Sequence, residues 1–203
     1  MLLYQFKMGT NPRRVIIYLS EKGLELPRYE LDYLNKEHRS PEYLTINPSG
    51  RAPTLITDEG IAISESAAIV EYLEELYPQA PMIGVEAASR AKVRALERVG
   101  NDLIVRCQMW LWNLTSAFPA KEPNPAREVA DKAYRYVSEL LDILEDAIGD
   151  REFLAGDRPT IADFTSFAIF QTARERFDQP LGCHHPRLDA WYRNFRVRPS
   201  ADY

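Results

Sequence analysis

The spacing of apolar and polar residues predicts a strand, a helix and a second strand at the start of the chain. Residues 2–6 form a short apolar run, and residues 29–33 alternate tyrosine and leucine with acidic residues, which is typical of a half-buried strand. Asn11 is a preferred N-cap and Pro12 suits the first helical position, so a helix is predicted to begin there. Gly23 is the expected C-terminal stop.

The next stretch predicts a short helix, a hairpin and a third helix. Residues 41–46 form the short helix, and residues 58–60 close the hairpin. The following helix has one apolar face, made of Ile69, Tyr72, Leu73 and Leu76. This order, βαβ followed by ββα, is that of a thioredoxin-like domain.

Beyond a proline-dense linker at residues 77–81, the pattern becomes entirely helical. One helix buries a stripe at three- and four-residue spacing, and a second does the same. These stripes are Leu96, Val99, Leu103, Cys107, Trp110 and Leu114, then Tyr134, Val137, Leu141, Leu144 and Ile148. We therefore predict an α/β domain at residues 1–78 and an all-α domain at residues 84–203.

Composition excludes several classes of partner. A net charge of −5 gives no basic footprint for nucleic acid. The sequence has no apolar run long enough to span a membrane, and the N-terminus does not resemble a signal peptide. Cys107 and Cys183 are far apart and have no ligand cluster beside them, which argues against a metal site or a disulfide framework. A cytoplasmic location is expected.

The stretch from Asn47 to Ser66 has the properties of a binding site for a peptide-like acid. Pro53 cannot donate to a sheet, so the backbone of Ala52 before it is left to pair with a ligand. Glu65 and Ser66 open a helix, where unpaired N–H groups and the helix dipole favour a carboxylate.

This combination resembles the glutathione-binding half of the cytosolic glutathione S-transferases. A second motif agrees, since Phe153–Asp157 followed by Thr160–Asp163 resembles the capping signature of the family's helical domain. We assign that motif only the structural role of starting a helix. The resemblance covers essentially the whole chain, and it implies glutathione as co-substrate and a homodimer.

The resemblance also implies individual roles. Pro53 would be a cis-proline that turns the Ala52 backbone towards the cysteinyl part of glutathione, whereas Glu65 and Ser66 would hold the γ-glutamyl end. Basic residues would approach the glycine carboxylate. These are His38, Arg39 and Arg51.

Catalysis in this family consists mainly of ionising the glutathione thiol, whose ordinary pKa is about 8.5. The donor must lie between the first strand and the first helix. This chain has Gly9 where several classes have serine, and it has no cysteine in this window. Thr10 and Asn11 are therefore the candidates, with Asn11 either a donor or only a helix cap, and Tyr4 is the next choice.

A small apolar electrophile would bind against the helical domain, and the candidate residues are Met109, Trp112 and Phe118. Without a cysteine near the first helix, thiol–disulfide exchange is disfavoured. A glutathione transferase with a role in detoxification is the leading hypothesis. The alternatives are a glutathione-dependent isomerase, ether-cleaving enzyme or peroxidase on the same fold, or a non-catalytic glutathione-binding module.

Overall fold

The computed structural model describes residues 1–114 and 127–202. The chain divides into two units, and each has more contacts within itself than with the other. The first contains Met1–Pro81 and the C-terminal residues from Pro199 onwards, and the second contains Met82–Arg198. No helix in the described part of the chain is long and apolar enough to cross a membrane.

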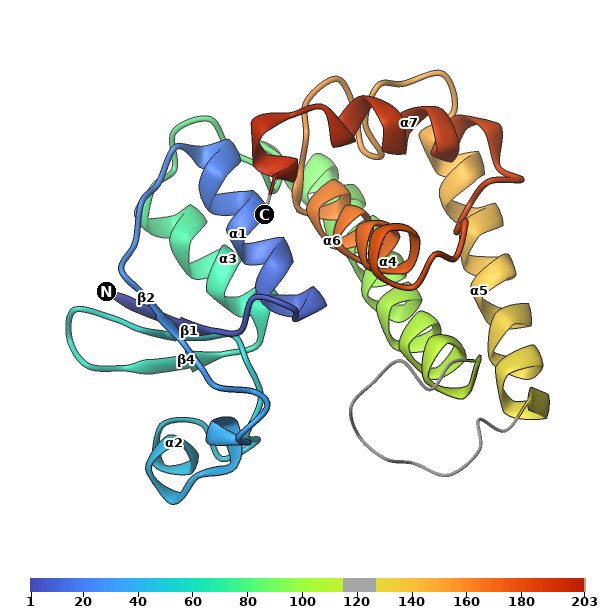
Figure 1. Cartoon of the computed structure of the whole chain (residues 1–203). Helices are drawn as coiled ribbons and strands as arrows, with labels where there is room; N and C mark the ends of the chain where they lie inside the picture. Colours follow the sequence, from blue (N-terminus) through green and yellow to red (C-terminus); the bar gives the residue numbers. More distant parts are fainter. Residues whose placement is uncertain (115–126, 203) are drawn as a thin grey trace. The chain divides into compact units, whose positions relative to one another are not determined.

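The first unit is built on a four-stranded sheet, shown in Figure 1, with the strand order β2-β1-β3-β4. Strand β1 pairs parallel to β2 and antiparallel to β3, and β3 pairs antiparallel to β4. The elements in chain order are β1 (Leu2–Gln5), α1 (Thr10–Lys22), β2 (Arg28–Glu30), η1 (Glu37–Arg39), α2 (Pro41–Ile46), β3 (Thr54–Ile56), β4 (Ala62–Ser64) and α3 (Ser66–Leu76). This is the predicted βαβ-ββα order of a thioredoxin-like domain.

The start of α1 differs from the prediction. Gly9 is the N-cap, its carbonyl accepts from the N–H of Arg13 at 3.0 Å, and Asn11 is already the second helical residue. Gly9 is buried in a crowded position, because a Cβ there would lie 2.6 Å from the Phe6 ring and 2.8 Å from Pro12. At the other end the structure confirms Gly23, which is left-handed with φ of 69° and ends the helix.

Two other predictions about burial were wrong. Leu31 is buried as the alternation predicted, but Tyr29 is 43% exposed and Tyr33 is 36% exposed, because β2 is an edge strand of the sheet. On α3, Ile69 and Leu73 are buried as predicted, but Leu76 is 47% exposed and Val70 takes a place in the core.

The C-terminal residues complete the first unit. The short helix η3 (Pro199–Ala201) packs against α1. Arg13 donates to the carbonyl of Ser200 at 3.2 Å, and the Ser200 hydroxyl bonds to Glu21 at 2.5 Å.

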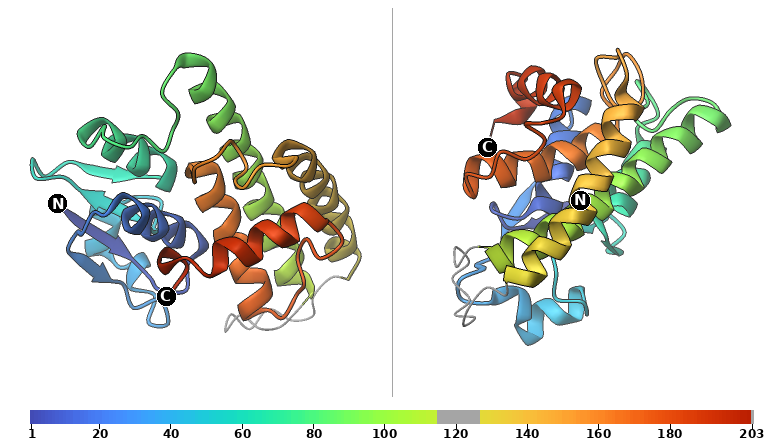
Figure 2. Two further views of the ribbon diagram at one scale, coloured as in Figure 1. Left: turned by 90° about the horizontal axis from the view of Figure 1, so that it is seen from above. Right: turned by 90° about the vertical axis from the view of Figure 1, so that its right-hand side faces the viewer.

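The second unit is all helical. Its elements are α4 (Ala87–Leu114), α5 (Arg127–Ile148), α6 (Ile161–Gln171), the π-helical turn η2 (Thr172–Arg176) and α7 (Pro186–Arg196). Helices α4 and α5 lie side by side in both views of Figure 2 and make many contacts with each other. Every residue of α6 is buried, so this helix is central, as its apolar composition predicted. Tyr134 is 41% exposed, which corrects its predicted place on the buried stripe of α5.

The predicted capping box at the start of α6 is present. The carboxylate of Asp163 accepts from the N–H and the hydroxyl of Thr160, at 2.9 and 3.0 Å. It also accepts from the N–H of Leu154 at 2.9 Å and from the indole of Trp191 at 3.0 Å. Burial raises the pKa of Asp163 to about 6, although these bonds favour its charged form.

Candidate functional site

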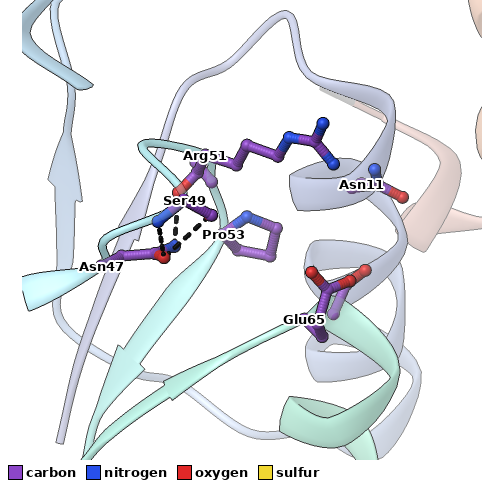
Figure 3. A pocket seen from close by; sticks show the side chains of 8 residues that line it. Asn11, Asn47, Ser49, Arg51, Pro53 and Glu65 are labelled. Atoms are coloured by element: carbon purple, nitrogen blue, oxygen red, sulfur yellow. Dashed lines mark hydrogen bonds between the residues drawn. The ribbon is translucent and has the colours of Figure 1, made fainter. Parts of the chain in front are cut away.

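A pocket in the first unit brings together three segments that are distant in sequence. It is lined by the start of α1, the loop before β3 and the start of α3, through Asn11, Asn47, Ser49, Arg51, Ala52, Pro53, Glu65 and Ser66. Figure 3 shows Arg51 extending from the loop towards the first turn of α1, where Asn11 lies, with the Glu65 carboxylate on the α3 side. The pocket has a cavity volume of about 40 Å³, which exceeds the roughly 10–15 Å³ that one water molecule needs. A cavity of this volume can enclose only one end group of a peptide.

The loop that forms one wall is held by Asn47, which is buried. Its amide nitrogen donates to the carbonyl of Arg51 and the hydroxyl of Thr54, both at 2.9 Å. Its amide oxygen accepts from the N–H and hydroxyl of Ser49 at 3.0 and 2.8 Å, as Figure 3 shows. The Tyr43 hydroxyl donates to the same Arg51 carbonyl at 2.7 Å. The backbone leading into Ala52 is therefore fixed before any ligand binds.

The Ala52–Pro53 peptide bond is cis, which confirms that prediction. Ala52 is buried at the pocket wall, and β3 begins two residues later at Thr54. The backbone of Ala52 therefore lies beside the pocket, just before the sheet begins.

The opposite wall is the N-terminus of α3. Glu65 is its N-cap, with φ of 67°, a left-handed conformation that costs a residue other than glycine about 1–3 kcal/mol. Such strain is found mostly at functional sites. The Glu65 side chain is exposed, whereas Ser66 is buried as the first helical residue.

A buried arginine that the sequence did not point to stands behind this wall. Arg14 is 4% exposed, and its Nε donates to the Ser66 hydroxyl oxygen at 2.6 Å. Because that oxygen accepts from Arg14, the Ser66 proton can be donated to a ligand. The guanidinium also adds a positive charge behind the N-terminus of α3, where the helix dipole already favours an anion.

Asn11 lies on the α1 side of the pocket. Since Gly9 is the N-cap, the side chain of Asn11 does not cap the helix, and its buried amide oxygen has no hydrogen-bond partner among the described residues. The capping-only interpretation of Asn11 is therefore wrong. Thr10 is buried beside it but does not line the pocket.

The other predicted basic residues lie outside the pocket lining. The ring of His38 stacks on Tyr33 with 4.9 Å between centroids, and its pKa is lowered by burial and then by the charges of Arg39 and Lys36. Arg39 donates to the carbonyl of Ser49 at 3.0 Å and packs against Gly50. It therefore supports the loop from outside, and only Arg51 of the three basic residues lines the pocket.

The remaining candidates are not part of this pocket. Met109 and Trp112 are exposed on α4, in the second unit. Phe118 lies outside the described residues. Tyr4 packs against Tyr29 and Tyr43, at centroid distances of 5.1 and 5.8 Å, as a core residue would.

Sequence reasoning missed Arg14 and gave Asn47 no role of its own. A signal for Arg14 was present, because it precedes Tyr18 of the buried stripe by one helical turn, and residues four apart share a face. The signal for Asn47 was its place just before the Pro48–Gly50 turn. Asparagine bonds its own backbone two residues on in such turns.

Comparison with known proteins agrees with this geometry. The family model described as "Glutathione S-transferase, N-terminal domain" matches residues 3–81, and that described as "Glutathione S-transferase, C-terminal domain" matches residues 110–199. The chain is 35% identical to a maleylacetoacetate isomerase from Pseudomonas aeruginosa, covering 99% of this chain and 91% of that one. It is 28% identical to glutathione S-transferase 3 from Zea mays, covering 98% and 90%.

Solved structures show the same similarity. A glutathione S-transferase domain-containing protein from Marinobacter aquaeolei superposes with a TM-score of 0.85 at 26% identity over 100% of both chains. A glutathione transferase from Phanerochaete chrysosporium, solved in complex with oxidized glutathione, has a TM-score of 0.85 at 25% identity and covers 98% of this chain and 92% of that one.

The thioredoxin-like unit, the helical unit and the two family-model matches thus define a glutathione-dependent enzyme. The chain belongs to the glutathione S-transferase family. As a member it is a glutathione transferase, and glutathione is its co-substrate.

Proposed function

We propose that the pocket of the first unit holds the γ-glutamyl end of glutathione and that the start of α1 activates the thiol for attack on a small apolar electrophile. The observation that carries this proposal is the convergence of Asn11, Ala52, Glu65 and Ser66 from three segments on one pocket. A polar cavity of this size suits one charged end group.

The γ-glutamyl carboxylate binds at the N-terminus of α3. The Ser66 hydroxyl and the free N–H groups of the first helical turn donate to it, and Arg14 adds a positive charge behind them. The Glu65 carboxylate attracts the neighbouring ammonium group. The backbone of Ala52 pairs with the cysteinyl residue, and Arg51 attracts the glycine carboxylate. Arg39 acts in this proposal through the loop that it supports, whereas His38 stacks on Tyr33 outside the pocket lining.

The thiol then lies against the start of α1. A helix N-terminus and one hydrogen-bond donor lower a thiol pKa by roughly one to two units. Asn11 is the better placed of the two candidates, because it lines the pocket and its side chain caps nothing. Thr10 contributes through the backbone of the same turn.

The proposal also assigns residues that contact the electrophile. Met109 and Trp112 present large apolar surfaces on α4 that are about half exposed, as residues that contact an apolar compound would. Phe118 is included as a third residue that contacts the electrophile, as the sequence suggested. The proposal places the enzyme in the cytoplasm.

Isomerisation is the second candidate function. It is favoured by the 35% identity, over nearly the whole chain, to a protein named maleylacetoacetate isomerase. The same thiolate would serve, since an isomerase adds glutathione to its substrate and later releases it. Assays of a chloronitrobenzene acceptor and of a cis-enediketone separate conjugation from isomerisation.

The site assignment is tested by isothermal titration of glutathione into the Ser66→Ala variant. Loss of a hydrogen bond to a charged group should weaken binding by about 1.5–3 kcal/mol. Ser20→Ala, an exposed serine on α1, is the matched control and should bind as the wild type does. Unchanged affinity in Ser66→Ala would count decisively against the assignment.

A homodimer belongs to the proposal as well. The sequence suggested Arg90, Arg94, Glu97 and Arg98 on α4 as its polar face, but Glu97 is 3% exposed and pairs with Arg98 within its own chain. Arg90, Arg94 and Arg98 remain as the proposed contributors to the dimer interface. Sedimentation as a monomer of the 23.4 kDa chain at micromolar concentration would remove the dimer.

A further inference from the structure

One face of α1 is covered by the C-terminal residues of the chain. Arg13, Ile17 and Glu21 follow one another at intervals of four, so they share this face of the helix. Arg13 donates to the Ser200 carbonyl at 3.2 Å, and the Ser200 hydroxyl bonds to Glu21 at 2.5 Å. Ile17, which lies between the two polar residues, is fully buried. The short helix η3 is thus bound to α1 over about two helical turns.

Arg13 belongs to the turn of α1 that the proposed function assigns to thiol activation. Its N–H donates to the carbonyl of the N-cap Gly9 at 3.0 Å and closes the first turn. Successive helical residues turn by about 100°, so Arg13 points about 160° away from Asn11, which lines the pocket. The bond from Arg13 to η3 therefore holds this turn from the side opposite the pocket.

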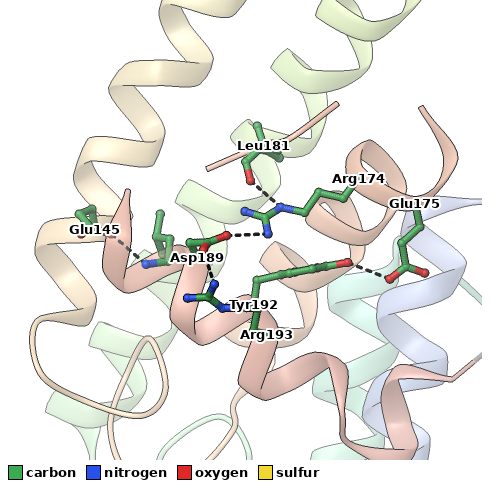
Figure 4. Close-up of polar contacts among 8 residues, drawn as sticks. Glu145, Arg174, Glu175, Leu181, Asp189, Tyr192 and Arg193 are labelled. Carbon is green, nitrogen blue, oxygen red and sulfur yellow. Dashed lines mark hydrogen bonds and ion pairs between the residues drawn. The ribbon is translucent and has the colours of Figure 1, made fainter. Parts of the chain in front are cut away.

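The segment that Arg13 binds is not a loose chain end. Two residues separate η3 from α7, and α7 is fixed within its own unit. As Figure 4 shows, Asp189 pairs with Arg174 at 2.8 Å and with Arg193 at 3.2 Å, and the Tyr192 hydroxyl donates to Glu175 at 2.8 Å. Terminal residues are ordered when they are tied down in this way.

The choice of an arginine for this contact is informative. The Arg13 side chain is 1% exposed, and Ser200 and Ala201 are buried as well. Burying a charged group is costly, so an apolar side chain would join η3 to α1 with a smaller loss of solvation. A guanidinium adds two properties that an apolar side chain lacks. These are a directed hydrogen bond and a positive charge beside the turn.

We propose that Arg13 is a positioning residue for ionisation of the glutathione thiol, and that η3 acts on the thiol through it. The bond between Arg13 and Ser200 keeps Asn11 and the free N–H groups of the first turn directed at the thiolate. Precise placement matters, because a shift of about 1 Å in a reacting group can reduce a rate roughly 100-fold. This inference rests on the proposed function, in which the start of α1 activates the thiol.

The first variant is Arg13→Lys, which keeps the positive charge but loses the guanidinium bond to Ser200. The thiol pKa of bound glutathione, followed by the ultraviolet absorbance of the thiolate, should rise by about 0.3–0.7. This is a two- to fivefold loss of thiolate at any pH below the thiol pKa. Arg28→Lys, an exposed arginine on β2, is the matched control and should leave the thiol pKa unchanged.

Affinity should separate from ionisation in Arg13→Lys. At about pH 5.5 the thiol of bound glutathione is mostly protonated, so the Kd measured there does not include the change in thiol pKa. It should change less than twofold, because Glu65 and Ser66 still hold the γ-glutamyl end. Titration calorimetry at this pH measures it.

Ser200→Ala tests η3 with a milder change. It removes the hydroxyl bond to Glu21 but keeps the backbone carbonyl that accepts from Arg13. The thiol pKa should rise in the same direction as in Arg13→Lys, and by less. If η3 acts through Arg13, the double variant should show no larger rise than Arg13→Lys alone, because the two changes interrupt one chain of contacts.

Tyr18→Phe controls for a general loss of stability. Tyr18 lies on the same helix, about two turns beyond Asn11, and its hydroxyl donates to Glu74 of α3 at 3.0 Å. Loss of this buried bond should lower the urea midpoint of unfolding, as Arg13→Lys should also do. Tyr18→Phe should nevertheless leave the thiol pKa unchanged, since its bond does not hold the first turn.

Three results would overturn the proposal. One is an unchanged thiol pKa in Arg13→Lys or, should that variant not fold, in Ser200→Ala. Another is an equal rise in Tyr18→Phe, which would make lost stability the cause. The third is a double variant whose rise is the sum of the two single rises, because η3 would then act independently of Arg13. The proposed function itself is contradicted only if Asn11→Ala also leaves the thiol pKa unchanged, so the two failures are distinguishable.

Discussion

Asn47 in the first unit and Asp163 in the second are buried polar side chains that each make four hydrogen bonds, but the two differ in charge and in what they position. Asn47 bonds to Ser49, Arg51 and Thr54 and so holds the loop before β3. Asp163 joins Leu154, Thr160 and Trp191 around the start of α6. Asn47 is neutral and shapes the wall of a pocket, whereas Asp163 can ionise and is surrounded by core.

This difference predicts how each unit responds to a change of pH. A neutral amide holds the loop before β3, so the shape of that pocket wall should not depend on protonation. The carboxylate of Asp163 makes the second unit sensitive to pH, because burial disfavours its charged form. We therefore expect the pocket wall at Asn47 to be insensitive to pH and the hydrogen-bond network of Asp163 to respond to it.

The largest effect is expected from Asn47→Ala. It leaves the Arg51 carbonyl and the Ser49 N–H with fewer partners, which should cost about 2–4 kcal/mol of unfolding free energy and weaken glutathione binding at least tenfold. Urea unfolding and titration calorimetry measure the two effects. Asn35 is exposed and, among the described residues, bonds only to Asp32, so Asn35→Ala should stay within about 0.5 kcal/mol. Equal behaviour of the two variants would refute the role given to Asn47.

Asp163 should show its effect through pH. With a pKa of about 6 in the folded chain and about 3.9 when unfolded, the folded state binds more protons between these values. The contribution of Asp163 to stability is therefore complete below about pH 4 and is lost as pH rises through 6, by roughly 2–3 kcal/mol.

The comparison for this prediction is Asp163→Asn, which cannot titrate. Other carboxylates contribute equally to both chains, so the difference in unfolding free energy between wild type and variant isolates Asp163. It should fall between pH 4 and pH 7. A difference that is flat or rises over this range would contradict the raised pKa.

A smaller effect is expected at Arg14. Arg14→Lys keeps the positive charge but loses the Nε bond to Ser66, so glutathione affinity should fall about tenfold, near the lower limit for a hydrogen bond to a charged group. Arg135→Lys, an exposed arginine on α5, serves as control. Calorimetry that finds both variants equal to the wild type would show that Arg14 does not position Ser66.

The order of elements and one wall of the pocket could be predicted from the sequence, because they depend on local rules. Pro53 and the pair Glu65–Ser66 are recognisable from residue type, spacing and context alone. Gly23 ends α1 because glycine adopts the left-handed conformation without cost.

What the sequence did not reveal depends on packing between distant segments. Asn11 is a good N-cap by residue type, but Gly9 is the cap, at a position where Phe6 and Pro12 leave no room for a Cβ. The bond from Arg14 joins residues 52 positions apart, which no local pattern encodes.

The most direct test of the account is the ionisation of bound glutathione in the Asn11→Ala and Thr10→Ala variants. The ultraviolet absorbance of the thiolate is followed against pH with the site saturated. We predict that Asn11→Ala raises the thiol pKa by about one unit or more, and that Thr10→Ala raises it less. If both variants bind glutathione with an unchanged thiol pKa, the start of α1 does not activate the thiol, and the central claim is wrong.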